Sequence, residues 1–223
     1  MTSLQALEIC TGDAPDASII WLHGLGADGH DFAPVVEALQ PLPHIRFILP
    51  HAPERPVTIN AGYIMPAWYD IYGSSLTDRH DTDGIRASQA QVEELIAREK
   101  ERGIPASRIA LAGFSQGGAI ALHTGLRHAE QLAGILALST YLPLPDTLAT
   151  ERSPHNLDTP IFMAHGSYDD VIPLTAASAS ARLLGQSGHA LEWHEYPMPH
   201  SLCNEEVADI AAFIARILAP GAA

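Results

Sequence analysis

A serine between glycines at residues 113–117 constrains the fold of this chain more than any other feature. The order Gly113-Phe114-Ser115-Gln116-Gly117 follows an apolar run at 109–112 and precedes a second one at 119–126. The first run suits a short buried strand, and the second can continue as a buried helix. Ser115 therefore lies at a sharp strand-to-helix turn, where glycines leave room for the crowded backbone. Such a turn, a nucleophile elbow, projects a serine hydroxyl from the edge of a parallel sheet.

Two partners for this serine are expected downstream, because a hydroxyl needs a base and the base needs an acid to orient it. The apolar run 160–164 predicts a strand, and Asp169 and Asp170 lie in the polar loop that follows it. His200 follows the predicted strand 191–196. Both loops lie at the carboxyl ends of strands, where open α/β sheets bind ligands. Spacing leaves Asp169 and Asp170 as alternatives, and the order serine, acid, histidine is that of an α/β-hydrolase.

A loop at residues 23–26 is a candidate for stabilising an oxyanion. The sequence His23-Gly24-Leu25-Gly26 follows a predicted strand at 18–22. It resembles the His-Gly-x-Gly loop that supplies one backbone N–H, here that of Leu25. The second donor would be the N–H of Gln116, which opens the helix after the serine and carries its positive dipole end. Each such donor lowers the barrier of acyl transfer by roughly 3 kcal/mol.

Strands and helices alternate along the chain, which predicts an α/β fold with a mostly parallel sheet and helices on both faces. The expected strands lie near 4–8, 18–22, 45–49, 108–112, 134–138, 160–164 and 191–196. A helix is expected at 83–101, and Asn204 is expected to cap the last helix.

The stretch 50–81 is the exception, because it is rich in Pro, Gly and aromatic residues and has no sustained period. We expect a long loop that folds over one side of the site and is too short to form a cap domain. Trp68 in this loop is expected to pack rather than line a pocket. The site should then be an open cleft, with Leu76, Tyr141 and Val171 as candidates for binding the substrate.

Length and charge exclude several classes of protein. A chain of 223 residues that is 47% hydrophobic is expected to bury one large core, so 1–223 is predicted to be a single domain. The net charge of −14 repels phosphate backbones and anionic lipids, so nucleic acid is not an expected partner. The twelve histidines include no paired short-spaced ligand motif. No metal and no cofactor are therefore expected.

The location of the protein is predicted from its start and its cysteines. The first residues lack a basic region before an apolar core, and nowhere do about 18 apolar residues run together. No integral membrane association is therefore expected. Two cysteines, Cys10 and Cys203, suit a reducing compartment better than a disulfide framework, which favours the cytoplasm. Because Cys203 lies close to His200 in sequence, it is also an alternative nucleophile.

Together these segments resemble the phospholipase/carboxylesterase family, the small cap-less α/β-hydrolases that include carboxylesterases and acyl-protein thioesterases. The resemblance covers nearly the whole chain and rests on 21–26, 49–53, 55–60, 67–70, 113–118, 139–143 and 198–201. The stretch 55–70 is more similar to bacterial members than to the eukaryotic depalmitoylating ones. By this resemblance Asp169 is the triad acid, because 166–169 aligns with the family's Gly-Asp-x-Asp. Ser167 departs from that pattern at its first aspartate.

The resemblance implies a serine hydrolase that cleaves carboxylic esters of short to medium acyl chain through an acyl-enzyme. Ser115 would attack, His200 would move the proton and Asp169 would orient His200. An acyl-protein thioesterase or lysophospholipase is the alternative that the same residues could serve. A catalytically silent binding protein of the same fold is an alternative of another class. The expected partner is a small-molecule ester or thioester, and because cap-less relatives often pair, a homodimer is also considered.

Overall fold

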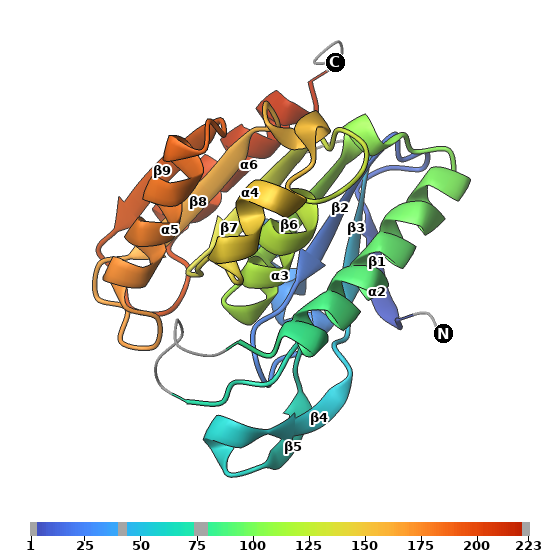
Figure 1. Ribbon diagram of the computed structural model, residues 1–223. Coiled ribbons are helices and arrows are strands. Elements are labelled where there is room, and N and C mark those ends of the chain that lie inside the picture. The colour runs from blue at the N-terminus through green and yellow to red at the C-terminus, as the bar shows by residue number, and fades with distance from the viewer. Residues whose placement is uncertain (1–3, 40–43, 74–79, 220–223) are drawn as a thin grey trace.

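The computed structural model describes residues 4–39, 44–73 and 80–219. Within these residues seven strands form one sheet in the order β1-β3-β2-β6-β7-β8-β9 (Figure 1). Neighbouring strands are parallel except at one edge, where β1 runs antiparallel to β3. The predicted fold class is therefore confirmed. The strands of this sheet are β1 (Ala6–Cys10), β2 (Ala17–Leu22), β3 (Ile45–Pro50), β6 (Ile109–Phe114), β7 (Gly134–Leu138), β8 (Ile161–Gly166) and β9 (Leu191–Tyr196).

Helices cover both faces of the sheet. One face packs against α2, α3 and α5, and the other packs against α1 and α6. Among the described helices, none has the length and apolar character that crossing a membrane requires. The α-helices are α1 (Ala33–Ala38), α2 (Thr82–Glu101), α3 (Gln116–Gly125), α4 (Leu148–Glu151), α5 (Leu174–Gln186) and α6 (Asn204–Ile217).

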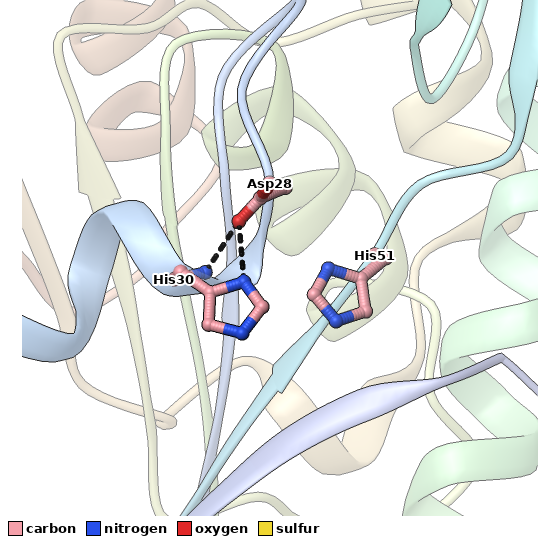
Figure 2. A group of neighbouring side chains, drawn as sticks. All are labelled: Asp28, His30 and His51. Atoms are coloured by element: carbon pink, nitrogen blue, oxygen red, sulfur yellow. Dashed lines mark hydrogen bonds and ion pairs between the residues drawn. The ribbon is translucent and has the colours of Figure 1, made fainter.

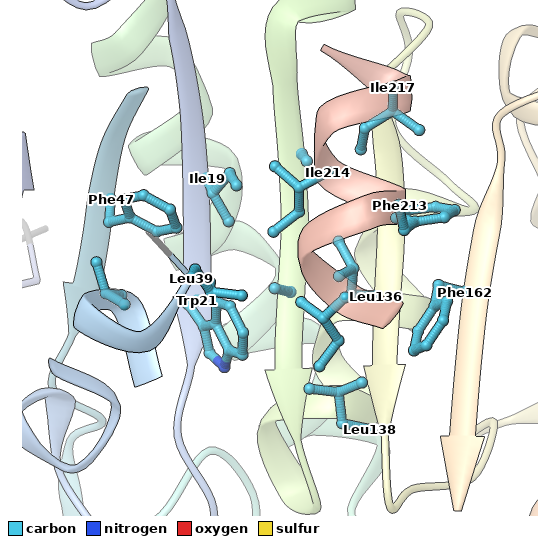
Figure 3. Close-up of a cluster of buried hydrophobic side chains, with 14 of the residues drawn as sticks. Ile19, Trp21, Leu39, Phe47, Leu136, Leu138, Phe162, Phe213, Ile214 and Ile217 are labelled. Carbon is cyan, nitrogen blue, oxygen red and sulfur yellow. The ribbon is translucent and has the colours of Figure 1, made fainter. Parts of the chain in front are cut away.

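The two faces of β2 show why its sequence is apolar throughout. Ile19 and Trp21 pack in the cluster beneath α1 and α6, which Figure 3 shows. Ile20 and Leu22 point to the opposite face and pack with α2 and α3. Since both faces of a parallel sheet are buried, its strands have continuous apolar sequences rather than alternating ones. Each such side chain contributes roughly 1.5–3 kcal/mol by leaving water, so the strands that carry the site are firmly held.

The N-cap of the last helix is Cys203, one residue before the position that the sequence predicts. Cys203 has extended backbone angles (φ −115°, ψ 166°) and occupies the N-cap position, while Asn204 is already the first helical residue. The prediction that Asn204 caps this helix is therefore wrong. The carbonyl of Cys203 accepts the N–H of Val207 at 3.0 Å, so the helical hydrogen bonds start there without a side-chain cap. Ile210, Ile214 and Ile217 face the core as expected.

A small hairpin lies in the stretch that the sequence left without regular structure. Strands β4 (Glu54–Val57) and β5 (Tyr63–Pro66) pair antiparallel and stand off the main sheet (Figure 1). Ala61 and Gly62 both have positive φ in the intervening turn. Two four-residue strands interrupted by proline give too short a pattern to detect, which explains why this hairpin was missed. Trp68 beyond it is fully buried, as expected.

Candidate active site

Ser115 lies at the turn from β6 into α3 with a strained backbone. Its φ of 55° and ψ of −122° place it in a conformation that L-residues rarely adopt. The main chain on both sides is fixed: the Ser115 N–H donates to the carbonyl of Leu138 at 2.9 Å. The Thr140 hydroxyl donates to the carbonyl of Ser115 at 2.7 Å. These contacts from the β7 end hold the turn that the elbow sequence predicts.

Two glycines allow this turn because main chain crowds them. A Cβ on Gly117 would lie 2.3 Å from the carbonyl oxygen of Leu22, on the neighbouring strand β2. A Cβ on Gly113 would lie 2.3 Å from the carbonyl oxygen of Gly117 itself. Backbone atoms cannot yield at such distances, so both positions require glycine.

His200 and Asp169 form a direct hydrogen-bonded pair. Nδ1 of His200 lies 2.6 Å from Oδ2 of Asp169, and the aspartate side chain is fully buried. The other carboxylate oxygen accepts the N–H groups of Val171 (2.9 Å) and Ile172 (2.8 Å). Asp170 is exposed and lies on the rim of a cleft instead. Of the two adjacent acids, the structure therefore brings Asp169 to His200.

A second histidine, which the sequence analysis did not single out, also reaches this carboxylate. His165 at the end of β8 is fully buried, and its Nε2 lies 2.8 Å from the carbonyl oxygen of Ile172. Because a carbonyl only accepts, Nε2 carries the hydrogen, and the same nitrogen lies 3.3 Å from Oδ2 of Asp169. Asp169 is thus surrounded by donors. His165 lies directly before Gly166 in the sequence, and nothing in this spacing distinguishes a histidine that bonds the acid from one that only packs in the strand.

The loop that carries Leu25 is held by the neutral form of His23. Nδ1 of His23 donates to the carbonyl of Gly24 (2.7 Å), and Nε2 accepts the N–H of Ala52 (3.0 Å). Burial lowers the pKa of His23, which keeps the ring neutral as this pattern requires. The carbonyl of His23 in turn accepts the indole N–H of Trp68 at 2.9 Å.

Gln116 has two separate roles in the structure. Its backbone N–H is the first of α3 and so has no acceptor within the helix. Its side chain accepts the N–H of Trp68 (2.8 Å) and donates to the carbonyl of Tyr69 (2.7 Å). The first role follows from the elbow sequence. The second was missed, because its partners lie in the irregular stretch before α2.

Two clefts in the described part of the chain meet at Ser115, and both include Leu25 and Val171. The first, here called the His200 cleft, has a volume of about 450 Å³. The second, here called the Tyr141 cleft, has a volume of about 400 Å³. The His200 cleft is lined by Gly24, Leu25, Ala27, Asp31, Phe32, Val35, Phe114, Ser115, Val171, His200, Ser201 and Leu202. The Tyr141 cleft is lined by Leu25, Ile59, Asn60, Tyr69, Ile71, Gly73, Ser115, Gln116, Tyr141, Asp170, Val171, Ile172 and Pro173.

The three residues expected to bind the substrate have different placements. Tyr141 is buried, lines the Tyr141 cleft and shares a hydrogen bond of 2.8 Å with the hydroxyl of Tyr69. Val171 is 59% exposed and stands between the two clefts. Leu76 lies outside the described residues.

Cys203 is poorly placed to replace the serine. It occupies the N-cap of α6 and is absent from the described lining of both clefts. Burial raises the pKa of the Cys203 thiol, which disfavours the reactive thiolate. The contacts around Ser115 and His200 therefore favour the serine as the nucleophile.

Asp28, His30 and His51 are the candidate metal ligands in the part of the chain that the structure describes. Each offers one ligand atom, and these atoms lie within 4.8 Å of one another. Figure 2 shows Oδ1 of Asp28 accepting from the N–H (2.7 Å) and from Nδ1 (2.9 Å) of His30. The N–H of Gly29 donates to Nδ1 of His51 at 3.2 Å. The bond between Gly29 and His51 fastens the loop after β2 to the residue that follows β3. Because His51 comes from a distant segment, the spacing of histidines along the sequence does not reveal this group.

Comparison with known proteins identifies relatives over nearly the full chain. A family model described as Phospholipase/Carboxylesterase matches residues 5–218. The chain is 41% identical over 215 residues to acyl-protein thioesterase 1 of Gibberella zeae, covering 92% of each protein. It is 43% identical over 213 residues to acyl-protein thioesterase 1 of Neurospora crassa, covering 91% of this chain and 87% of that protein. The crystal structure of Zea mays acyl-protein thioesterase 2 superposes with a TM-score of 0.87 at 29% identity, covering 96% and 99% of the two chains.

Proposed function

The chain belongs to the phospholipase/carboxylesterase family, and from this premise we propose that it is a serine hydrolase that cleaves acyl thioesters, with carboxylic esters as secondary substrates. The sequence alone predicts esters as the main substrates and thioesters as the alternative. The names of the relatives favour the reverse order, because proteins about 40% identical over most of the chain are acyl-protein thioesterases. Both reactions pass through the same kind of tetrahedral oxyanion, so one site can serve both.

The observation that carries this proposal is the pairing of His200 with Asp169 beside Ser115. The 2.6 Å contact fixes the ring of His200 with Nδ1 toward the buried carboxylate, which leaves Nε2 as the nitrogen that can exchange a proton with substrate. Ser115 and His200 line the same cleft. Asp169, with both oxygens hydrogen-bonded, can stabilise the imidazolium that forms during the reaction without taking its proton.

In the proposed reaction the Ser115 hydroxyl attacks the acyl carbon and gives its proton to His200. The carbonyl oxygen becomes an anion, which the N–H groups of Leu25 and Gln116 receive. Collapse of this intermediate breaks the bond to the leaving sulfur or oxygen, which takes the proton from His200. Water then attacks the acyl-enzyme by the same route and releases the carboxylic acid.

The acyl chain would lie in the Tyr141 cleft. Ile59, Ile71 and Tyr141 give this cleft an apolar lining on the side of Gln116. Each buried methylene adds roughly 0.8 kcal/mol, so kcat/KM should rise with chain length until the cleft is filled. We expect this optimum between about four and ten carbons, because a cleft of about 400 Å³ holds a short ligand.

The test is a parallel series of acyl thioesters and p-nitrophenyl esters with four to sixteen carbons, measured below micelle-forming concentrations. The proposal expects thioesters to be cleaved at least as well as esters of the same length. Ester cleavage with negligible thioester cleavage would restore the carboxylesterase interpretation. If neither series is cleaved by correctly folded protein, the silent binding protein is favoured. Lysophospholipids, tested in the same assay, address the remaining alternative.

The cytoplasmic location, the homodimer and the single domain over 1–223 stay predictions. The free state of Cys10 and Cys203 supports the first of these, since a reducing compartment keeps thiols unpaired.

A further inference from the structure

Asp28, His30 and His51 lie outside the described lining of both clefts, yet they adjoin the loop that carries Leu25. Two imidazole nitrogens and one carboxylate oxygen are ligands that suit zinc, whereas calcium and magnesium take six or more oxygens. We propose that these three side chains bind a zinc ion, with water in the remaining position, and that the bound ion slows catalysis by displacing the Leu25 loop.

Two of the ligand atoms already have the spacing that a metal requires. Nδ1 of His30 lies 2.9 Å from Oδ1 of Asp28, and a hydrogen on this nitrogen bridges them (Figure 2). Zinc bonds of about 2.0–2.2 Å place neighbouring ligand atoms of a tetrahedral site about 3.4 Å apart. An ion can therefore take the place of the bridging hydrogen with little movement of either side chain. The ring of His30 is 66% exposed, so packing in the core does not hold it there.

His51 supplies the third ligand from the other segment. Its ring lies 5.2 Å from the ring of His30, centroid to centroid, and faces the Asp28–His30 pair in Figure 2. Nδ1 of His51 accepts the N–H of Gly29 at 3.2 Å, so this nitrogen carries the lone pair. A metal ion would take that lone pair and release the N–H of Gly29.

Main-chain packing keeps the two segments close enough to form a site. A Cβ on Gly29 would lie 2.2 Å from the carbonyl oxygen of Leu49, at the end of β3. The backbone of the loop after β2 therefore rests directly on β3, one residue before His30 and two residues before His51. The three ligand atoms lie within 4.8 Å of one another, so a zinc ion would draw the farthest pair together by about 1 Å.

The charge of this region favours a cation. Asp28 and Asp31 both lie in the short turn after the Leu25 loop, and residues 23–33 include no lysine or arginine. The chain as a whole carries a net charge of −14. The local field therefore raises the concentration of divalent cations near the three ligands.

Movement at this site reaches the Leu25 loop from both of its ends. Asp28 follows Leu25 by three residues in the chain. His51 precedes Ala52, whose N–H donates to Nε2 of His23 at 3.0 Å. A displacement of about 1 Å near a reacting group can cost up to about 100-fold in rate. We therefore expect saturating zinc to lower kcat/KM by about tenfold without contacting Ser115.

The first experiment measures zinc binding without reference to activity. Protein freed of metal with EDTA is titrated with zinc chloride at pH 7.5 by isothermal titration calorimetry, and one ion per chain is expected at this site. His30→Gln and His51→Gln should each weaken binding by about 100-fold or more, because each removes one of three ligands. Asp28→Asn keeps an oxygen for the N–H of His30 but loses the charge, so it should weaken binding by about tenfold or more. His155→Gln, the same change on an exposed ring elsewhere, is the matched control and should bind as the wild type does.

The second experiment compares kcat/KM for p-nitrophenyl octanoate in saturating zinc and in EDTA. Taking this ratio within each protein removes any effect of a substitution on activity without zinc. The ratio should be about one tenth for the wild type and for His155→Gln, and close to one for His30→Gln at the same zinc concentration.

Zinc binding that survives both His30→Gln and His51→Gln would place the ion elsewhere, for example on His200, and would overturn the proposal. So would inhibition that His30→Gln does not relieve, because the ion would then act at another position. Binding at this site with unchanged kcat/KM would refute the effect on the Leu25 loop. If folded protein cleaves neither thioesters nor esters, the proposed function fails, and calorimetry still decides whether the metal site exists.

Discussion

The backbone around Ser115 is held in two different ways on its two sides. On the side of β7 and β8, main-chain groups hold the functional residues Ser115 and Asp169. The Ser115 N–H is fixed by the carbonyl of Leu138. The carboxylate of Asp169 is fixed by the N–H groups of Val171 and Ile172. Here most of the holding groups are main-chain groups, at the end of β7 and in the loop after β8, and the hydroxyl of Thr140 adds one side-chain contact.

On the side of β2 the relationship is inverted, because side chains hold the main chain. The ring of His23 bridges Gly24 and Ala52. The side chain of Gln116 bridges the main chain of Trp68 and Tyr69. The loop that carries Leu25 is held by the side chain of His23 and by one main-chain bond, from the N–H of Gly26 to the carbonyl of Pro66 at the end of β5 (2.9 Å).

This difference separates two kinds of substitution. On the first side, replacing a functional side chain should remove chemistry and leave the neighbouring backbone in place. On the second side, replacing a buried side chain should move the backbone donors, so activity and stability should fall together.

The largest effect is expected for Ser115→Ala. Turnover should fall by about 10⁵-fold or more, because the nucleophile is lost while the oxyanion donors remain. The melting temperature should not fall, since the hydrogen bonds at this position involve main-chain atoms of Ser115. Steady-state kinetics and thermal unfolding measure both. A folded variant with wild-type turnover would show that Ser115 is not the nucleophile.

The next effect compares the two adjacent acids. Asp169→Asn should lower kcat by about 10³ to 10⁴-fold, because an amide NH₂ group can face Nδ1 of His200 and favour the wrong tautomer. Asp170→Asn, on an exposed side chain one residue away, should change kcat by less than about threefold. The pair of variants is its own control. Equal losses at both positions would contradict the assignment of Asp169.

The first side was largely predictable from the sequence, for a physical reason. A strand-to-helix turn with main chain in contact on both sides demands glycine, and this demand is visible at Gly113 and Gly117. The strand before Asp169 begins with a continuous apolar run, and the strand before His200 alternates apolar and polar residues, so the carboxyl ends of both strands, and hence both loops, could be located. The predicted strands at 134–138 and 191–196 agree with β7 and β9 residue for residue.

The second side was not predictable beyond the Leu25 loop itself. The side chain of Gln116 bonds main-chain groups that lie 47 and 48 residues away, in a stretch without periodicity. The cluster of Asp28, His30 and His51 shares this property, because His51 comes from a different segment than the other two. Such contacts depend on which segments the fold brings together, and neither spacing nor composition encodes that locally.

A third variant tests directly whether side chains hold the main chain on the side of β2. Gln116→Ala keeps the backbone N–H at the start of α3 but leaves the buried N–H of Trp68 and carbonyl of Tyr69 without their partner. Each unpaired buried group costs about 1–3 kcal/mol, so the melting temperature should fall, and kcat/KM should fall by about tenfold as the Leu25 loop shifts. Gln186→Ala, at the exposed end of α5, is the matched control and should do neither. Lost activity without lost stability would mean that the amide acts on the substrate instead of holding the backbone.

The smallest expected effect concerns stability at low pH, which His23 on the side of β2 should change. Burial lowers the pKa of His23 in the folded protein, whereas the unfolded chain takes up a proton near pH 6.5. The stabilisation from the neutral ring is therefore complete above pH 6.5 and is lost as the pH falls below it. A glutamine oxygen can still accept the N–H of Ala52 but cannot titrate. His23→Gln should be less stable than the wild type at pH 7.5, because the bond to Gly24 is lost.

As the pH falls from 6.5 toward 5, this gap should narrow by up to about 1.4 kcal/mol per pH unit, the value of one proton. Urea unfolding at pH 7.5, 6.5 and 5.5 measures the free energy of unfolding of both proteins. His123, whose pKa burial lowers to about 3, stays in both and contributes the same slope to each, so the difference isolates His23. His155→Gln, on an exposed ring, should follow the wild type throughout. A gap that stays constant across this range would show that His23 does not hold the Leu25 loop as a neutral ring, and the contrast between the two sides would then rest on Gln116 alone.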